Sequence, residues 1–550
     1  MSYAAPLADI RFALEACAGF WSVREGGRFP DLDEDLLSAI LEGAAALSND
    51  TLAPLNRVGD QVGVTLKEDV VTTPPGFREA YQAVRDGGWQ GIAFDPAYGG
   101  QGLPRSLMVS VLEMINGANM SFGLLPLLTL GAIEAIDLHG APDQKALYLE
   151  KLISGEWTGT MNLTEPQAGS DLGAMTTKAV PRPDGSYVIS GQKIFITWGE
   201  HDLAPNIIHL VLARIEGAPA GSKGISLFIV PKFRDEDGSR NAVRCIGLEE
   251  KMGIHASPTC TMAYEGATGW LIGGENKGLA AMFTMMNAAR LNIGLQGAAV
   301  AEAACQKAYA FARERKQGGA LIIEHPDVKR MLVTMRAKIQ AARAICYATA
   351  VAADKGQHAR EALLTPIAKA WSTDLGVEAA SLGVQVHGGM GFIEETGAAQ
   401  YYRDARIAPI YEGTNGIQAI DLYGRKILGD RGEEMRRLIA ETVDAAKHAH
   451  GKIGQRLKEG AAALEEATAY MLAASRPDAL AGATEYLALA GDVVGGMLLA
   501  SGLKRALALP AMTKSLLVEQ EALLGYYAET VLARAAGRLP AIKIGAAALG

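Results

Sequence analysis

The sequence is poor in cysteine. Its 550 residues contain five cysteines, which are Cys17, Cys245, Cys260, Cys305 and Cys346. They are odd in number and widely separated, and no Cys-x-x-Cys pair occurs. This pattern excludes a disulfide framework and a structural zinc site, and it is typical of a reducing compartment.

An excess of positive charge is also lacking. The chain has 52 Lys and Arg against 61 Asp and Glu, a net charge of −9. Residues 431–550 hold 14 Lys and Arg and 13 Asp and Glu, so this region is nearly neutral. Neither balance favours binding to nucleic acid, which requires a basic surface.

Long hydrophobic runs are absent as well. The longest spans 121–133, about 13 residues with Pro126 inside it, whereas a membrane-spanning helix needs about 20 residues. Asp9 and Glu15 interrupt the N-terminal segment, which argues against a signal peptide. We therefore expect a cytoplasmic protein without a membrane span.

Several catalytic motifs are missing. The chain has no GxxxxGK[ST] phosphate-binding loop, no GxSxG and no HExxH. The glycine-rich stretch 388–392 lacks the GxGxxG spacing of a dinucleotide fold. Among the nine histidines only His448 and His450 have metal-ligand spacing, and on a helix these two would point to different faces, so we expect no metal site.

The hydrophobic pattern divides the chain into helical, β, helical and helical regions. Helical periodicity dominates 36–159, and short β-branched runs between Gly, Pro and Asp follow in 160–275. Helical periodicity returns in 276–430 and in an extra C-terminal region, 431–550, while 1–35 form an N-terminal arm. We expect an α+β fold, mostly α, because strands and helices do not alternate as in a doubly wound sheet.

Three long helices are predicted in the second half of the chain. Their apolar periodicity spans 279–317, 327–356 and 365–389. Abundant alanine favours close packing of such helices, because Ala has a high helix propensity and a small side chain.

Three polar segments could carry chemistry. Residues 161–179 offer hydroxyls and backbone N–H groups to a planar polar ligand, although a loop between domains would look the same. Residues 191–202 place Thr197 beside aromatic residues at the end of a strand, as a simple hairpin also could. Residues 401–422 contain Glu412 between apolar neighbours, where desolvation raises a carboxylate pKa toward that of a general base. The alternative is a helix N-terminal Glu favoured by the helix dipole.

Five segments in order, LTEPQAGSD, ISGQKIFIT, ARERKQGG, QVHGGMGF and YRDARIAPIYEGTNGIQ, resemble the flavin-dependent acyl-CoA dehydrogenase family. The resemblance covers about 36–430. It implies an N-terminal helical domain, a middle β-barrel and a C-terminal four-helix bundle, here followed by an additional helical extension.

The resemblance implies the oxidation of an acyl-CoA to the trans-2-enoyl-CoA. Glu412 matches the catalytic base that removes the α-proton, while the β-hydrogen leaves as hydride to N5 of FAD. The Glu412 backbone N–H and a ribityl hydroxyl would polarise the thioester carbonyl, because the enolate-like charge needs aimed donors in a dry site. Some relatives carry the base in the helix after the barrel, but 285–294 contain no carboxylate here.

The resemblance also implies the residues that bind FAD and CoA. The isoalloxazine and diphosphate would lie against Met161, Leu163, Thr164, Ser170, Phe195, Ile196 and Thr197. The FAD of a neighbouring subunit would be reached by Arg315 and covered by Gln385, Val386, His387, Gly388 and Gly389, while Thr414 and Gly416 hold the adenosine side. Substrate contacts would come from Ser170, Arg290 and Gly413. Because each site borrows residues from a partner, we expect a homodimer or a dimer of dimers.

Three positions depart from the family pattern. Many relatives have Trp in place of Phe195, Asn in place of Trp198 and Thr in place of Gln317. These differences concern flavin packing and electron exit rather than the reaction.

Residues outside 36–430 resemble a long bacterial subgroup. It includes 3-(methylthio)propanoyl-CoA dehydrogenases of dimethylsulfoniopropionate breakdown and enzymes for ordinary fatty acyl-CoAs. The methylthio substrate is our first expectation. Alternatives are a general short- to long-chain acyl-CoA dehydrogenase, an acyl-CoA oxidase, a DNA-binding flavoprotein, which the neutral tail disfavours, and an inactive scaffold, which Glu412 disfavours. By resemblance, the electron acceptor is an electron-transferring flavoprotein.

Overall fold

The computed structural model describes residues 3–234 and 237–550. The chain forms two compact units. One contains Met1–Ala45, Pro104–Gly117 and Arg290–Gly550, and the other contains Ala46–Leu103 and Ala118–Ala289. Each unit is described separately below.

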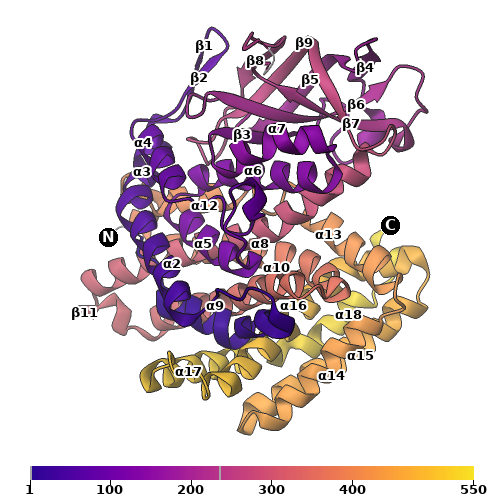
Figure 1. Ribbon diagram of the computed structural model, residues 1–550. Coiled ribbons are helices and arrows are strands. Elements are labelled where there is room, and N and C mark those ends of the chain that lie inside the picture. The colour runs from indigo at the N-terminus through magenta and orange to yellow at the C-terminus, as the bar shows by residue number, and fades with distance from the viewer. Residues whose placement is uncertain (1–2, 235–236) are drawn as a thin grey trace. The chain divides into compact units, whose positions relative to one another are not determined.

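The second unit contains helices and a seven-stranded sheet (Figure 1). The sheet strands are β3 (Trp157–Asn162), β4 (Lys178–Pro181), β5 (Tyr187–Thr197), β6 (Asn206–Ile215), β7 (Ile225–Pro231), β8 (Val243–Leu248) and β9 (Thr259–Ile272). The other elements are η3 (Leu47–Leu52), α3 (Ala53–Val62), the hairpin β1 (Thr65–Lys67) and β2 (Val70–Thr72), α4 (Phe77–Asp86), η4 (Pro96–Tyr98), α6 (Met120–His139), α7 (Pro142–Ile153), η5 (Leu172–Ala174) and η6 (Ser222–Gly224).

The sheet closes into a barrel. Its order is β3-β6-β4-β5-β9-β7, and an additional pairing of β6 with β7 joins the path into a ring, while β8 pairs with β9. β6 is parallel to β3 and β4, and the other pairings are antiparallel. Inward-facing side chains such as Ile189, Val211 and Phe228 fill the barrel. The predicted β region is therefore confirmed as a barrel.

The first unit is almost entirely helical. Its N-terminal elements are α1 (Leu7–Arg11), η1 (Phe12–Cys17), η2 (Phe20–Gly27) and α2 (Glu34–Ala46), the last crossing the unit boundary. Its central elements are α5 (Arg105–Ala118) and α8 (Gly278–Glu314), which both cross the unit boundary, and β10 (Lys316–Gln317), β11 (Ala320–Leu321), η7 (Ile322–Glu324), α9 (Pro326–Asp354), α10 (His358–His387), α11 (Gly389–Phe392), η8 (Glu394–Thr396), α12 (Ala398–Ala405), α13 (Asn415–Asp421) and η9 (Leu422–Ile427). The C-terminal elements are α14 (Glu433–His448), α15 (Gly451–Ala473), α16 (Arg476–Ala506), α17 (Lys514–Thr530), η10 (Leu532–Arg538), α18 (Leu539–Ile542) and η11 (Ala546–Leu549).

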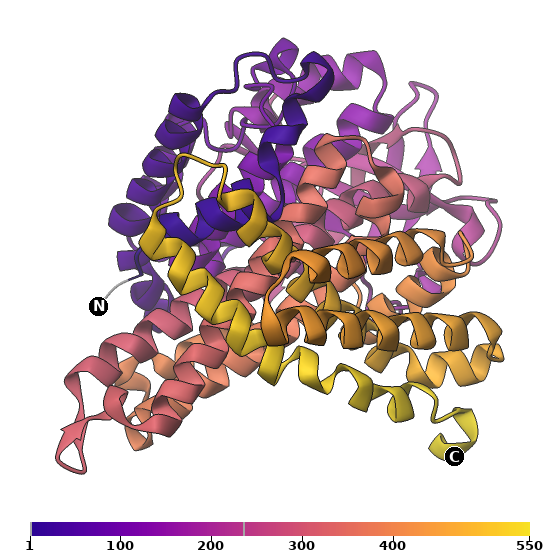
Figure 2. The same ribbon diagram turned by 90° about the horizontal axis from the view of Figure 1, so that it is seen from below.

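The three long helices predicted from periodicity are confirmed as α8, α9 and α10, with 37, 29 and 30 residues. α8 ends at Glu314, three residues before the predicted end, because Lys316–Gln317 turn into the β10–β11 hairpin. Figure 2 shows this hairpin at the free ends of α8 and α9. α10 begins at His358, before the predicted start, since Pro366 is accommodated inside the helix.

A buried charge cluster ties α5, α8 and α9 together. The Arg343 guanidinium is 2.6 Å from the Glu113 carboxylate and 3.1 Å from that of Glu302, and the Tyr347 hydroxyl also donates to Glu113. Arg343, Glu113 and Tyr347 are fully buried. A buried charge is tolerable only when it is paired in this way.

The N-terminal segment packs against the C-terminal helices of the same unit. Phe12, Leu14 and Phe20 are fully buried, and η1 contacts α9 and α16. Arg505 of α16 donates one hydrogen bond of 2.6 Å to the Cys17 carbonyl and another to the Ala16 carbonyl. These bonds satisfy carbonyl groups at the C-terminal end of η1. Residues predicted as an arm thus belong to the core of this unit.

Two helices, α6 and α16, are long and apolar enough to cross a membrane. The sequence count of about 13 residues underestimated α6, which is 20 residues long. However, 83% of the apolar window of each helix is buried inside the protein. α16 also carries Asp492, which accepts hydrogen bonds from Trp371 and Arg538. Both helices therefore have the burial of core helices.

Candidate active site

Glu412 lies on a strained turn between α12 and α13 of the first unit. Its φ of 54° is in the left-handed region, and Gly413 follows with φ 85°. The turn is closed by an N–H···O bond of 3.0 Å from Asn415 to the Pro409 carbonyl. Side chains other than glycine rarely adopt a left-handed conformation, and such strain is typical of functional sites.

The carboxylate and the backbone N–H of Glu412 form no hydrogen bonds within the described residues. Among residues 3–234 and 237–550, no group donates to the carboxylate oxygens and no group accepts from the N–H. Its carbonyl, by contrast, accepts from the Gln418 amide at 3.3 Å. The carboxylate and the N–H of one residue are thus both available to a ligand.

The environment of Glu412 suits a base. Burial raises the pKa of its carboxyl to about 7, against the opposing charges of Arg290 and Lys369. A base with a pKa near the working pH combines an available ionised form with a strong tendency to take a proton. The apolar sequence neighbours of Glu412 predicted such a raised pKa.

Arg290 of α8 braces the same turn. It is 4% exposed, and its Nε donates to the Glu412 carbonyl at 3.5 Å. Its guanidinium also pairs with Asp421 of α13 at 3.2 Å. The residue predicted as a substrate contact is therefore also a structural partner of the loop.

The residues after the base begin α13. Thr414 caps this helix, since its hydroxyl accepts the Ile417 N–H at 3.2 Å. Gly413 allows close packing, because a Cβ there would lie 3.0 Å from the Gln418 amide nitrogen. Thr414 and Gly416 are exposed, as a ligand-facing position requires.

In the second unit, the polar segment 161–177 folds around a carboxylate that the sequence analysis missed. Glu165 accepts hydrogen bonds from the N–H and hydroxyl of Thr176 and Thr177 and pairs with Lys193 at 2.9 Å. The hydroxyls of Thr176 and Thr177, which lie in the segment predicted to offer hydroxyls to a ligand, donate to Glu165. A buried carboxylate needs such donors, so both hydroxyl protons are used inside the protein.

The Glu165–Lys193 pair fixes the loop onto β5. The Lys193 ammonium also donates to the Leu163 carbonyl at 3.0 Å, and the Ile194 N–H donates to the Thr164 carbonyl at 2.9 Å. Leu163 and Thr164 are half-buried, Met161 is 7% exposed, and Ser170 is exposed.

The end of β5 presents an aromatic ring to solvent. Phe195 and Trp198 have left-handed φ values of 58° and 53°, and the pairing with β9 shifts register between Lys193 and Ile196. This irregularity leaves Phe195 57% exposed while Ile196 and Trp198 are buried. The end of β5 therefore carries an exposed aromatic ring and, two residues later, the half-buried Thr197 hydroxyl.

The remaining predicted residues lie in the first unit, near the end of α8. Val386 packs in one apolar cluster with Ala312 and Ile322, which flank the exposed Arg315 in sequence. His387 stacks on Phe311 at 4.4 Å between ring centroids. Gly388 follows with φ 61°, and Gln385, Gly388 and Gly389 are exposed. The structure therefore brings the predicted adenine-side segment next to the helix end that carries Arg315.

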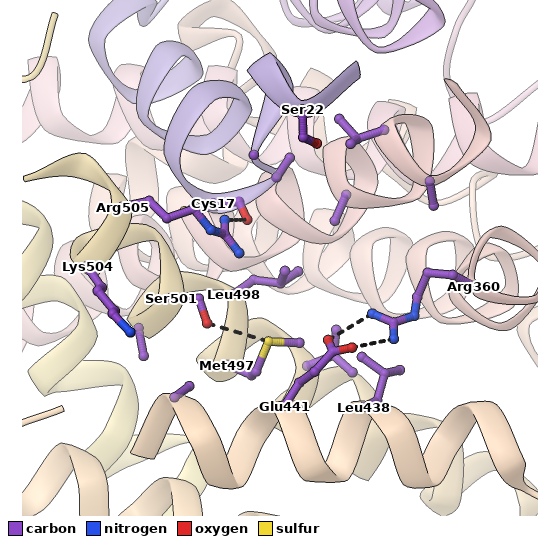
Figure 3. Close-up of a pocket in the computed structure, with 18 of the residues that line it drawn as sticks. Cys17, Ser22, Arg360, Leu438, Glu441, Met497, Leu498, Ser501, Lys504 and Arg505 are labelled. Carbon is purple, nitrogen blue, oxygen red and sulfur yellow. Dashed lines mark hydrogen bonds and ion pairs between the residues drawn. The ribbon is translucent and has the colours of Figure 1, made fainter. Parts of the chain in front are cut away.

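A separate cavity of about 740 Å³ lies in the first unit (Figure 3). It is lined by the N-terminal segment and by α9, α10, α14 and α16, and none of the predicted site residues lines it. The Arg360 guanidinium binds Glu441 through two hydrogen bonds of 2.9 and 2.6 Å at its edge. Two further charged groups of its lining, Glu15 and Lys355, pair with Arg11 and Glu25, which lie outside it.

No group of three or more His, Cys, Asp or Glu side chains that could hold a metal ion occurs in the described part of the chain. The titratable groups of the candidate site are carboxylates and cations without such clustering.

Comparisons with known proteins agree with this arrangement. Family models match as follows: acyl-CoA dehydrogenase N-terminal domain at residues 61–156, middle domain at 160–267, C-terminal domain at 276–427, and acetyl-CoA dehydrogenase C-terminal-like domain at 433–549. The 3-methylmercaptopropionyl-CoA dehydrogenase of Ruegeria pomeroyi is 46% identical over 529 residues, 90% of each chain.

Two further similarities extend over most of the chain. The broad-specificity linear acyl-CoA dehydrogenase FadE5 of Mycobacterium tuberculosis is 34% identical over 86% of this chain and 85% of its own. A crystal structure of an acyl-CoA dehydrogenase complexed with FAD from Bacillus anthracis has a TM-score of 0.74 at 22% identity, covering 94% of this chain and 88% of that one.

Proposed function

Because the chain belongs to the FAD-dependent acyl-CoA dehydrogenase family, we propose that Glu412 is its catalytic base and 3-(methylthio)propanoyl-CoA its substrate. The product is the corresponding trans-2-enoyl-CoA. The observation that carries the proposal is the Glu412 turn, where an unpaired carboxylate of raised pKa and an unpaired N–H belong to one residue.

The chain's own residues perform the proton half of the reaction. The Glu412 carboxylate takes the proton from Cα of the thioester. The backbone N–H of the same residue donates to the thioester carbonyl oxygen, where negative charge develops as the proton leaves. Holding donor and base on one rigid turn fixes both against the substrate before reaction.

FAD, when bound, supplies the acceptor for the hydride that leaves Cβ. We propose that Met161, Leu163, Thr164, Ser170, Phe195, Ile196 and Thr197 hold one end of it. The exposed Phe195 ring and the half-buried Thr197 fit a planar group with a polar rim. Ser170, Arg290 and Gly413 are the proposed contacts of the acyl-CoA.

The substrate proposal rests on relatedness. The relative at 46% identity is named for 3-methylmercaptopropionyl-CoA, which is the same compound as 3-(methylthio)propanoyl-CoA. A thioether is nearly isosteric with a methylene, so a pocket for one also admits an ordinary acyl chain. The second candidate is therefore a general linear acyl-CoA dehydrogenase, favoured by the relative named for broad specificity.

Flavin bleaching under anaerobic conditions tests the function and the substrate together. The purified protein is mixed with 3-(methylthio)propanoyl-, butanoyl-, octanoyl- or palmitoyl-CoA, and the loss of flavin absorbance is timed. We expect the fastest reduction with the methylthio substrate. Faster reduction by octanoyl- or palmitoyl-CoA would favour the general enzyme, and rapid reoxidation by air would indicate an oxidase.

A variant pair tests the base. Glu412→Gln keeps the size of the side chain but cannot take a proton, so reduction should slow by at least ~10³-fold, of the order expected for a lost general base. Glu395→Gln makes the same substitution at an exposed glutamate in η8 and serves as the matched control. Normal flavin reduction in Glu412→Gln would exclude Glu412 as the base.

We further propose that two subunits complete each site. The supporting features are the exposed Arg315 and the exposed Gln385, Gly388 and Gly389, whose sequence neighbours Ala312, Ile322 and Val386 pack in one apolar cluster. A homodimer or a dimer of dimers in the cytoplasm would pass electrons to an electron-transferring flavoprotein. Light scattering of the holoenzyme and reduction of such a flavoprotein test these points.

A further inference from the structure

A buried lysine lies in the middle of α10. Lys369 is fully buried, and its ammonium donates to the Gly413 carbonyl at 3.0 Å and to Asn415 Oδ1 at 2.9 Å. These acceptors lie one and three residues after Glu412. Burying an ammonium is costly unless it is hydrogen-bonded, and the turn after Glu412 supplies the acceptors that Lys369 needs.

Close packing of α8 and α10 determines where Lys369 lies. A Cβ at Gly294 would be 2.6 Å from the Ala368 carbonyl oxygen, and one at Gly297 would be 2.2 Å from that of Ser372. Only glycine permits this approach. α10 is therefore held against α8 on both sides of Lys369 along the chain.

Asn415 extends the contact along α10. Its amide group donates to the Ala370 carbonyl at 3.1 Å, to the Thr373 hydroxyl at 3.0 Å and to Asp374 at 2.8 Å. Together with the Asn415 N–H bond to Pro409, this fixes the C-terminal side of the turn. The Glu412–Gly413 turn is thus attached to the middle of a 30-residue helix.

The charges around Lys369 come from several elements. Glu412 and Asp374 are the facing carboxylates, Arg290 of α8 is the facing cation, and Arg406 lies by Asp374. Burial lowers the pKa of Lys369 to about 7, against the attraction of Asp374 and Glu412. Its charge in turn opposes the burial that raises the pKa of Glu412.

We propose that Lys369, with Asn415, is the positioning residue of this active site, and that it holds the Glu412–Gly413 turn in the orientation that proton abstraction needs. The inference deepens the proposed function and rests on it for the role of Glu412. The attachment of the turn itself can be measured independently of any reaction.

Hydrogen–deuterium exchange of the holoenzyme tests the attachment. Lys369→Met removes the charge and the donors while keeping an unbranched side chain. We expect amides of 407–418 to exchange at least tenfold faster, with little change elsewhere. The matched control is Lys338→Met on α9, whose lysine pairs with Glu378. Equal exchange of 407–418 in Lys369→Met and wild type would overturn the proposal.

The pH profile of single-turnover flavin reduction tests the link to the base. The base must be ionised, so the rate rises with pH through the pKa of Glu412. Loss of a nearby positive charge raises that pKa, and in Lys369→Met we expect the midpoint about one pH unit higher and a plateau at least tenfold lower.

A second variant separates position from charge and guards against misfolding. Asn415→Ala keeps the lysine charge, so the plateau should fall while the midpoint stays in place. Flavin content and melting temperature of each variant report the fold. An unchanged plateau in both variants, despite faster exchange, would overturn the positioning role. Failure of the wild type to be reduced by any acyl-CoA would refute the proposed function instead, and the exchange data would still decide whether Lys369 holds the turn.

Discussion

Breaking the buried Lys193–Glu165 ion pair should cause a large, local loss of stability. The two side chains are 0% and 1% exposed, and their charged atoms lie 2.9 Å apart. Lys193→Met removes the cation and leaves Glu165 buried. Removal of one partner of a buried pair costs about 3–5 kcal/mol. We expect about 3 kcal/mol, the lower end of that range, because Thr176 and Thr177 still donate four hydrogen bonds to the carboxylate.

The pKa of Glu165 gives the same magnitude. Burial works against the ionised carboxylate, yet Lys193 and Thr177 lower its pKa from 4.5 to about 2. A shift of one pKa unit corresponds to about 1.4 kcal/mol, so the lowered pKa of Glu165 favours the ionised folded state by about 3 kcal/mol. The contribution is present above pH 4.5 and is lost as the pH falls toward 2. Burial also lowers the pKa of Lys193 to about 8, which works against the folded state at neutral pH, so the ion pair as a whole stabilises the protein much less than the Glu165 shift alone suggests.

Exchange of the Thr176 and Thr177 amides measures this effect, because both N–H groups donate to Glu165. In Lys193→Met we expect roughly 100-fold faster exchange, which corresponds to about 3 kcal/mol. Lys178→Met, at an exposed lysine on β4, is the control. The double variant with Glu165→Gln should recover most of the loss. Exchange within threefold of wild type in the single variant would refute the reasoning.

Three further predictions concern the rest of the chain. Flavin reduction should rise with pH through about 7 as Glu412 loses its proton, and a flat profile between pH 5.5 and 8.5 would contradict this. Gly297→Ala should destabilise the protein by about 1–3 kcal/mol, because its Cβ would overlap α10, whereas Gly525→Ala, with nothing within 4 Å, should not; thermal denaturation compares them. Arg343→Met should cost about 3–5 kcal/mol, because it removes the cation that pairs with the buried Glu113 and the partly buried Glu302, and a melting temperature equal to wild type would argue against that cluster as a stabilising element.

The long helices and the barrel could be predicted because their signals are local and repeated. α8, α9 and α10 show apolar periodicity over many turns, and β5, β6, β7 and β9 are β-branched runs between turn residues. Glu412 could be predicted from its apolar neighbours and from the family motif around it.

Partners far apart in sequence could not be predicted. Glu165 and Lys193 are 28 residues apart, and Lys369 and Gly413 are 44 apart. In the sequence alone, a buried lysine or glutamate cannot be distinguished from one at the surface. One signal was present for Lys369, which lies between Ile367 and Ala370 in an apolar stretch of helix, where a charge needs a buried partner. The outward turn of Phe195 was hidden too, because strand alternation gives no sign of a register shift.

The contact between the N-terminal segment and α16 has a consequence for biosynthesis. Arg505 binds the Ala16 carbonyl across 489 residues of chain. At about 5–20 residues per second, a ribosome needs about 25 to 100 s to synthesise the intervening chain. Throughout that time Phe12, Leu14 and Phe20, which are fully buried in the finished protein, have no α16 to cover them. The segment η1 is therefore made long before α16, and it can reach its final packing only after α16 has been synthesised.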